Sequence, residues 1–241
     1  MRCGGVLKKC LKKFILREKY DSETYIKYLR NQGVTIGKRV NVYEPRSVCI
    51  DITRPYLIEI GNDVKITRGV TILTHGYDWS VLAGLYDEVL GSAGKVTIGN
   101  NVFIGMQTTI LKGVKIGNNV IIGANSLVNK DIPNNVVVAG NPAKVIMSIN
   151  DYYEKRKREQ IAEVFEMYDC YVRAYDKEPT EDIFSEFFWL FHDRDEPIPG
   201  CFEKYMRYHD RYAETLRNYE NSQPVFKGFR EFIKAVKQEK N

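Results

Sequence analysis

A six-residue repeat of β-branched residues fills the middle of the chain and constrains its fold more than any other feature. Sixteen hexads can be written from Val34, seven before an interruption at residues 76–95 and nine after it. The third position is Ile or Val in thirteen hexads, the first position is Val or Ile in twelve, and Gly follows the third position six times. A period of six is a multiple of two and not of 3.6, so each hexad predicts a short strand.

The repeat also predicts how these strands are arranged. First and third positions point to one side of a strand, where β-branched residues pack well. The Gly and Asn residues that follow can adopt positive φ and let the chain turn sharply. Three faces per turn would close a triangular prism with coils of about 18 residues, which stack to bury a shared core. A β-sandwich is the alternative, but its strands do not keep a six-residue register for so long.

Composition and charge divide the chain into three segments. Its 44% hydrophobic and 28% charged residues are ordinary globular values and exclude a disordered or collagenous chain. Residues 1–39 hold 11 Lys/Arg against 3 Asp/Glu, so the basic character is local and does not indicate a nucleic-acid partner. Nineteen of the 29 aromatic residues lie in residues 148–241. We therefore predict a helical N-terminal segment at 1–33, the repeat region at 34–147 with a loop insertion at 76–95, and an α-helical C-terminal extension at 148–241.

Helical signals mark both ends of the chain. A helix is predicted at 22–31, capped by Asp21 or Ser22 and ended by Gly33. Before it, an apolar face is surrounded by lysines, which is typical of a packing helix or of a helix on an anionic membrane surface. The residues of this face and its lysines are Leu7, Leu11, Phe14, Ile15, Lys8, Lys9, Lys12 and Lys13. C-terminal helices are predicted at 149–174, 181–191, 201–219 and 226–238.

Several classes of protein are excluded by what the sequence lacks. It has no run of 18 apolar residues that would span a membrane, and its first residues make a poor signal peptide. Five Cys without metal-ligand spacing indicate a reducing compartment. A zinc hydratase needs three His around its metal, and the repeat region holds only one, which excludes that class. We therefore expect a cytoplasmic protein without a metal, whose basic N-terminus makes at most a weak, peripheral contact with a membrane.

The second block of repeats resembles a known family. Residues 96–146, and above all the run SLVNKDIPNNVVVAGNPAKVI, are similar to the hexapeptide-repeat acyltransferases. The nearest branch contains the maltose, galactoside and xenobiotic acetyltransferases and the polysaccharide O-acetyltransferases. The resemblance extends over residues 34–147, roughly half of the chain. It implies a mainly β fold, the left-handed parallel β-helix, with acetyl-coenzyme A as donor and a homotrimer whose active sites lie where subunits meet.

His75 is the last residue before the insertion and the only histidine of the repeat region. A lone histidine at a corner often caps a backbone group, so the residue type alone assigns no function. The resemblance places the catalytic base of the family at His75. An imidazole, with an ordinary pKa of about 6.5, suits removal of a hydroxyl proton as the acceptor attacks a thioester. A carboxylate or carbonyl should hold the ring, and Asp51 and Asp78 are both candidates.

The same resemblance assigns the donor site residue by residue. Small residues and lysines match positions that hold acetyl-coenzyme A in the family: Gly105, Met106, Gly123, Ala124, Asn129, Lys130 and Lys144. Lysines supply point charges for the coenzyme phosphates, although each could equally be a solvated corner residue. Two departures from the family pattern are Phe103, where many relatives carry Trp, and Lys144, where Arg is common. A backbone N–H near Gly105 and Met106 is expected to bind the oxyanion.

The insertion is expected to shape the acceptor site. Asp51, Tyr77, Asp78 and Trp79 are the candidate acceptor contacts, and the apolar residues of the loop are expected to pack on a neighbouring face. The sequence thus predicts direct transfer of an acetyl group to a sugar hydroxyl of a surface polysaccharide or its precursor. N-acetylation of a nucleotide-sugar amine, acetylation of an antibiotic, and an inactive β-helix used as a scaffold remain open alternatives.

Overall fold

The computed structural model of the chain describes residues 16–209 and 211–239. The chain divides into two units, with the boundary between Tyr152 and Tyr153, and each unit is described by itself. The basic amphipathic stretch predicted around Leu7 to Ile15 lies outside the described residues. Within the described residues, no helix is both long and apolar enough to cross a membrane.

The first unit begins with η1 (Arg17–Lys19) and the helix α2 (Ser22–Gln32). The Asp21 side chain caps α2 by accepting a hydrogen bond from the backbone N–H of Thr24 at 2.8 Å. Gly33 ends the helix with a φ of 107°, as the sequence predicted. The buried face of α2 carries Tyr25, Ile26 and Leu29, which pack into the core of the first unit.

Three sheets follow, which we name A, B and C. Sheet A has the order β1 (Thr35–Ile36), β4 (Ile58–Ile60), β7 (Val96–Ile98) and β10 (Lys115–Ile116). Sheet B has the order β2 (Asn41–Val42), β5 (Lys65–Ile66), β8 (Val102–Ile104), β11 (Val120–Ile122), β13 (Val136–Ala139) and β14 (Lys144–Ser148). Sheet C has the order β3 (Cys49–Ile50), β6 (Thr71–Ile72), β9 (Thr109–Ile110) and β12 (Leu127–Val128).

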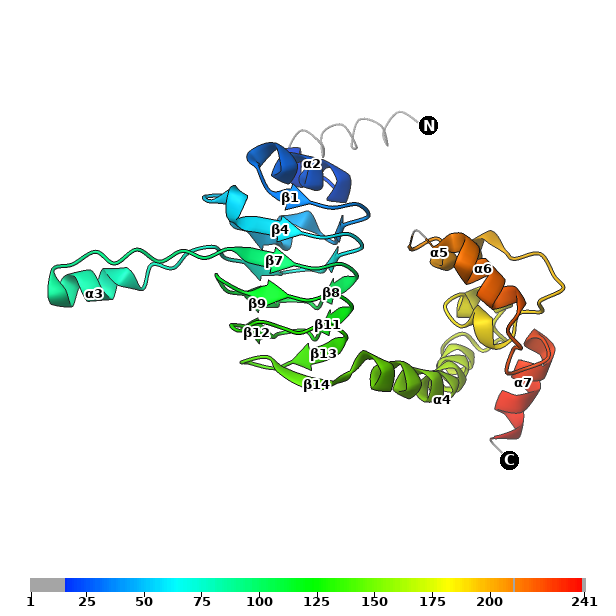
Figure 1. Ribbon diagram of the computed structural model, residues 1–241. Helices are drawn as coiled ribbons and strands as arrows, with labels where there is room; N and C mark the ends of the chain where they lie inside the picture. The colour runs from blue at the N-terminus through cyan, green and yellow to red at the C-terminus, as the bar shows by residue number, and fades with distance from the viewer. Residues whose placement is uncertain (1–15, 210, 240–241) are drawn as a thin grey trace. The chain divides into compact units, whose positions relative to one another are not determined.

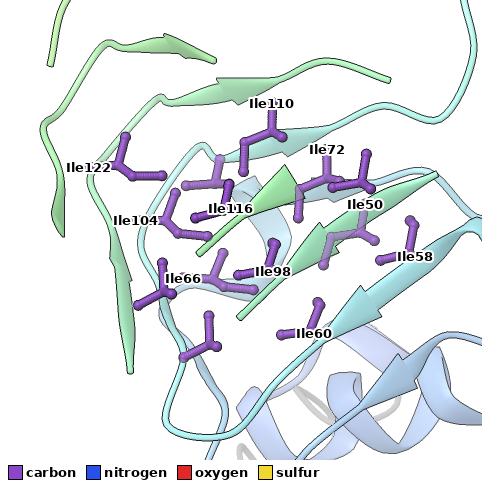
Figure 2. Packing of buried hydrophobic residues seen from close by; sticks show 14 of the residues in the cluster. Ile50, Ile58, Ile60, Ile66, Ile72, Ile98, Ile104, Ile110, Ile116 and Ile122 are labelled. Carbon is purple, nitrogen blue, oxygen red and sulfur yellow. The ribbon is translucent and has the colours of Figure 1, made fainter. Parts of the chain in front are cut away.

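From β1 to β12, consecutive strands enter sheets A, B and C in turn, so each of these coils gives one strand to each sheet (Figure 1). Pairing among β1–β13 is parallel, and Thr97 lies beside Lys115, 18 residues further along the chain. The Ile and Val residues of the hexads point inward and stack in columns (Figure 2). The predicted coils of short parallel strands are therefore present. We name the turns between sheets the A/B, B/C and C/A edges.

The A/B edge is held by a ladder of asparagines. The Asn62 side-chain oxygen accepts a hydrogen bond from the Lys38 backbone N–H at 2.7 Å. The same contact repeats from the N–H of Asn62 to Asn100, from Asn100 to Asn118 and from Asn118 to Asn134, at 2.7–2.8 Å. Each corner thus satisfies a backbone donor of the coil next to it.

The hexad register fails at the first and last coils. Residues 52–57 were predicted as a strand but contain η3 (Pro55–Leu57), because Pro55 has no N–H to give to a ladder. A second short helix, η2 (Pro45–Ser47), precedes β3. At the other end β14 pairs antiparallel with β13, where the hexads have Asn134 and Gly140 instead of an apolar third residue.

The insertion forms an arm at the C/A edge, residues 76–95, that contains the helix α3 (Trp79–Tyr86). Its base is an antiparallel bridge between His75 and Ala93. Three apolar side chains of the arm are exposed, by 72% at Val81, 67% at Leu85 and 70% at Val89, and Leu82 is partly buried. The expectation that they pack on a face is therefore wrong for the faces of this chain, and α3 extends outward from the coils (Figure 1).

The second unit is helical and has its own aromatic core. It contains most of α4 (Ile149–Tyr175), then η4 (Glu181–Phe184), η5 (Phe188–Leu190), α5 (Gly200–Met206), α6 (Tyr212–Glu220) and α7 (Phe229–Gln238). The helix predicted at 181–191 is thus two short 3-10 turns, and the one predicted at 201–219 is divided into α5 and α6. Phe184, Phe191 and Phe232 pack against one another in the core of this unit, which explains the aromatic bias of the segment.

Candidate active site

Two coils bring Asp51 and His75 together at the C/A edge. Asp51 follows β3 and His75 lies shortly after β6, and these two strands are neighbours in sheet C. The His75 Nδ1 atom lies 2.6 Å from Asp51 Oδ2, with both side chains largely buried. The fold therefore joins two candidates that are 24 residues apart in the sequence.

The Asp51 carboxylate is surrounded by donors. Oδ1 accepts the Thr53 backbone N–H at 2.9 Å and the Thr53 hydroxyl at 2.7 Å. Oδ2 accepts the Thr74 N–H at 3.1 Å and a short hydrogen bond from the Thr74 hydroxyl. Burial alone raises the pKa of Asp51, but the hydrogen bonds from Thr74 and Thr53 outweigh it and hold this pKa well below its ordinary value. Asp51 is thus an anion at neutral pH.

An anionic Asp51 fixes the proton of the imidazole. A carboxylate can only accept, so Nδ1 of His75 must donate, and in the neutral imidazole Nε2 then has no proton and can accept one. The ring of Tyr77 meets the imidazole edge-on at 4.9 Å between centroids. Such an arrangement can serve as a general base whose tautomer is set by a buried carboxylate.

The other acceptor candidates lie on the arm. Trp79 is the first residue of α3, and its ring lies 6.2 Å from that of Tyr77. Asp78 occupies the N-cap position of α3, and its carboxylate lies against Gly76, where an added Cβ would clash with it. Of the two carboxylates left open by the sequence, the structure thus places Asp51 on the imidazole.

The donor candidates fall on two different edges of the chain. Asn129 and Lys130 follow β12 and share the C/A edge with His75, two strands further along sheet C. Turns from sheet B to sheet C carry another four, Gly105, Met106, Gly123 and Ala124. Lys144 joins them at the B/C edge, because the Ala143 N–H just before it donates to the Leu127 carbonyl at 2.8 Å. The donor candidates therefore form two groups, one at the C/A edge and one at the B/C edge.

Gly105 and Gly123 have a structural role that the sequence interpretation did not include. A Cβ on Gly105 would lie 2.6 Å from the backbone nitrogen of Ala124, so the close approach of two coils requires glycine there. The Gly105 N–H donates to the Ile122 carbonyl at 2.8 Å. Its proposed part in an oxyanion hole is therefore corrected, because this N–H is used within the coils.

Thr53 and Thr74 are the residues that the sequence interpretation missed. The signal was available, because Thr53 follows Asp51 by two residues, as in an Asx turn, and Thr74 directly precedes His75. Among residues 16–209 and 211–239, no group of three or more His, Cys, Asp or Glu is placed to hold a metal ion.

The repeat region of the chain is similar to known proteins. Residues 95–130 match the family model described as bacterial transferase hexapeptide (six repeats). The chain is 44% identical over 131 residues to Protein CapG of Staphylococcus aureus, over 53% of this chain and 73% of that protein. It is 43% identical over 110 residues to galactoside O-acetyltransferase of Escherichia coli (strain K12), over 44% of this chain and 53% of that protein. A solved maltose O-acetyltransferase from Clostridium difficile 630 is 28% identical, with a TM-score of 0.38, over 58% of this chain and 81% of that one.

Proposed function

The chain belongs to the hexapeptide-repeat acyltransferase family, and from this premise we propose that it is an acetyl-coenzyme A-dependent O-acetyltransferase. Its acceptor is a sugar hydroxyl, of a surface polysaccharide or its precursor. The similarity to galactoside O-acetyltransferase supports a sugar acceptor, although the chain spans only 53% of that protein. The left-handed sense of the coils is part of the same proposal.

One observation carries the proposal, namely the Asp51–His75 pair, in which Nδ1 faces the carboxylate and Nε2 of the neutral imidazole is the nitrogen that can accept a proton. Nε2 accepts the hydroxyl proton of the acceptor as its oxygen attacks the thioester carbonyl carbon. The tetrahedral adduct then collapses, the C–S bond breaks, and the imidazolium returns the proton to the leaving sulfur. Asp51 stabilises the imidazolium between these steps, and the acetyl group passes directly from donor to acceptor without an acyl-enzyme.

The division of donor residues between two edges supports a trimer. In a ring of three copies, one edge of each chain faces a different edge of the next, as in any closed head-to-tail assembly. We place the C/A edge with His75 and Lys130 against the B/C edge with Ala124 and Lys144 of the neighbour. The three donor grooves then lie between chains, and the exposed apolar residues of the arm have a neighbouring subunit to pack on.

The residues at the two edges suit an acyl-coenzyme A. Met106 is 47% exposed and Ala124 is also exposed, so the B/C edge offers an apolar surface for a thin pantetheine arm. Lys130 and Lys144 are exposed and supply positive charge for phosphates. In this proposal the coils hold the donor, and the arm contributes Tyr77, Asp78 and Trp79 to the acceptor site.

The proposal is tested by measuring the release of free coenzyme A thiol with acetyl-coenzyme A and a panel of sugar, amine and antibiotic acceptors. We expect turnover with a sugar, and a His75→Ala variant about 100-fold to 10,000-fold slower, with coenzyme affinity almost unchanged. Turnover with amines alone would replace the O-acetyltransferase by an N-acetyltransferase. Near-parental turnover of His75→Ala would remove His75 as the base.

A further inference from the structure

The two threonine hydroxyls beside Asp51 have no part in the mechanism above. We propose that Thr53 and Thr74 are positioning residues that hold His75 in the tautomer with the proton on Nδ1. They act through Asp51 and contact neither donor nor acceptor. The inference rests on the proposed role of His75 as the base, but its central measurement does not depend on any acetyl transfer.

The first part of the argument is the orientation of the carboxylate. Each Asp51 oxygen receives one backbone N–H and one threonine hydroxyl, so the carboxylate is held at both oxygens. Thr74 is fully buried, and Asp51 is 7% exposed, so water cannot readily replace the Thr74 hydroxyl as a donor. Hydrogen bonds to a charged acceptor are stronger than neutral ones and are costly to lose in a buried site. These four hydrogen bonds from Thr53 and Thr74, which we call the clamp, thus favour an ionised Asp51 with Oδ2 directed at His75.

The second part is the position of Thr53 between the two partners. Its single hydroxyl proton goes to Asp51 Oδ1 at 2.7 Å, so the lone pairs of Oγ1 remain to face His75 Nδ1, 3.3 Å away. Nδ1 therefore meets two acceptor oxygens, from Asp51 and from Thr53. A proton on Nδ1 satisfies both oxygens, whereas an unprotonated Nδ1 would bring three lone pairs together.

A merely structural role for the hydroxyls makes a different prediction. The backbone N–H groups of Thr53 and Thr74 already bind Asp51, so the turn keeps these contacts when a hydroxyl is replaced by a methyl group. Valine has nearly the shape of threonine and removes only the hydroxyl. If the hydroxyls serve stability alone, Thr→Val changes the unfolding temperature and leaves the imidazole as it was.

The test is the nitrogen chemical shifts of the His75 imidazole, measured by NMR on the full-length protein labelled with ¹⁵N. We expect the parent to show the Nδ1–H form almost alone, and Thr53→Val/Thr74→Val to raise the proportion of the Nε2–H form about tenfold. Thr53→Ser and Thr74→Ser keep the hydroxyl and should restore the parental ratio. Thr108→Val is the matched control, since Thr108 is also fully buried and donates its hydroxyl elsewhere, to the Gly123 carbonyl at 3.2 Å.

Two further results decide the inference. An unchanged tautomer ratio in the double valine variant, or the same change in Thr108→Val, would overturn it. Should Thr74→Val fail to fold, Thr53→Val alone carries the test, because Thr53 is exposed and its replacement leaves the core intact. With a working acceptor, kcat of the double variant should fall in proportion to the Nδ1–H form that is lost, while KM for acetyl-coenzyme A changes less than about twofold. If the parent shows no catalysis but the valine variants still shift the tautomer ratio, the proposed function is wrong and the positioning role of the two threonines stands.

Discussion

An active site shared between two chains can be tested by mixing two inactive variants. His75→Ala removes the base at the C/A edge. Ala124→Trp fills the B/C edge with a large side chain, and because Ala124 is exposed, the change should leave the core of the coils undisturbed. Each variant alone is expected to lose activity by about 100-fold or more. The two variants carry different tags and are produced together in one cell.

The expected recovery follows from the two-edge geometry. A shared site takes its C/A edge from one chain and its B/C edge from the neighbour, and in an equal mixture each edge is intact in half of the chains. About one quarter of the sites should therefore be complete, so the mixture should regain about a quarter of the parental activity. If both edges of a site belonged to one chain, every chain would be defective and the mixture would stay inactive.

A second mixture gives an internal control. The parent is co-produced with the double variant His75→Ala/Ala124→Trp in equal amounts. Sites between chains predict about one quarter of the parental activity, and sites within chains predict about one half. The assay is release of coenzyme A thiol, with chain ratios read by mass spectrometry and assembly by light scattering. An inactive first mixture and a half-active second one, both trimeric, would refute the shared site.

Three other predictions follow from the same geometry. Lys130→Ala and Lys144→Ala should each weaken acetyl-coenzyme A binding about threefold to tenfold in calorimetry, and the loss should shrink in high salt; equal binding at low salt would contradict the donor assignment. The pKa of Asp51 is lowered in the folded state, so Asp51 stabilises the fold above its ordinary pKa of about 3.9 and loses this contribution as the pH falls further. Chemical unfolding should therefore show the stabilities of the parent and Asp51→Asn converging below about pH 4. Replacement of residues 80–93 by a Gly-Ser link should raise the acceptor KM more than about tenfold and change coenzyme binding less than about threefold, and equal losses in a folded trimer would contradict the separate roles.

The sequence predicted the coils well because their information is local. Each hexad specifies its own strand through a residue such as Ile98 or Ile116, and a parallel register follows once the corners repeat. The prediction failed where one residue changes the backbone rule, as at Pro55, or where the repeat loses its apolar residue, as at Asn134. The C-terminal helices were less exact because packing of an aromatic core decides where they end.

Local sequence patterns could not predict which residues come together in the site. Asp51 and Asp78 are equally plausible partners of His75 in the sequence, and only the stacking of β3 on β6 favours Asp51. The sequence did not predict the two threonines, because the role of a hydroxyl group becomes clear only when its hydrogen-bond acceptor is known. The division of the donor candidates between two edges depends on which two sheets each turn connects, and a linear motif does not contain this information.

The asparagine ladder joins the coils at a regular spacing. Each coil makes the same contact with the next, whether the paired asparagines lie 16, 18 or 38 residues apart, so a coil could be added or removed with Asn62 meeting Asn118 in place of Asn100. His75 and Lys130 lie two coils apart along their edge, about 10 Å at the usual strand spacing. Changing the number of coils between them would alter this reach in steps of about 4.8 Å and leave every corner satisfied. In the proposed active site, the span between His75 and Lys130 is thus set by the number of whole coils between them and not by fine adjustment of side chains.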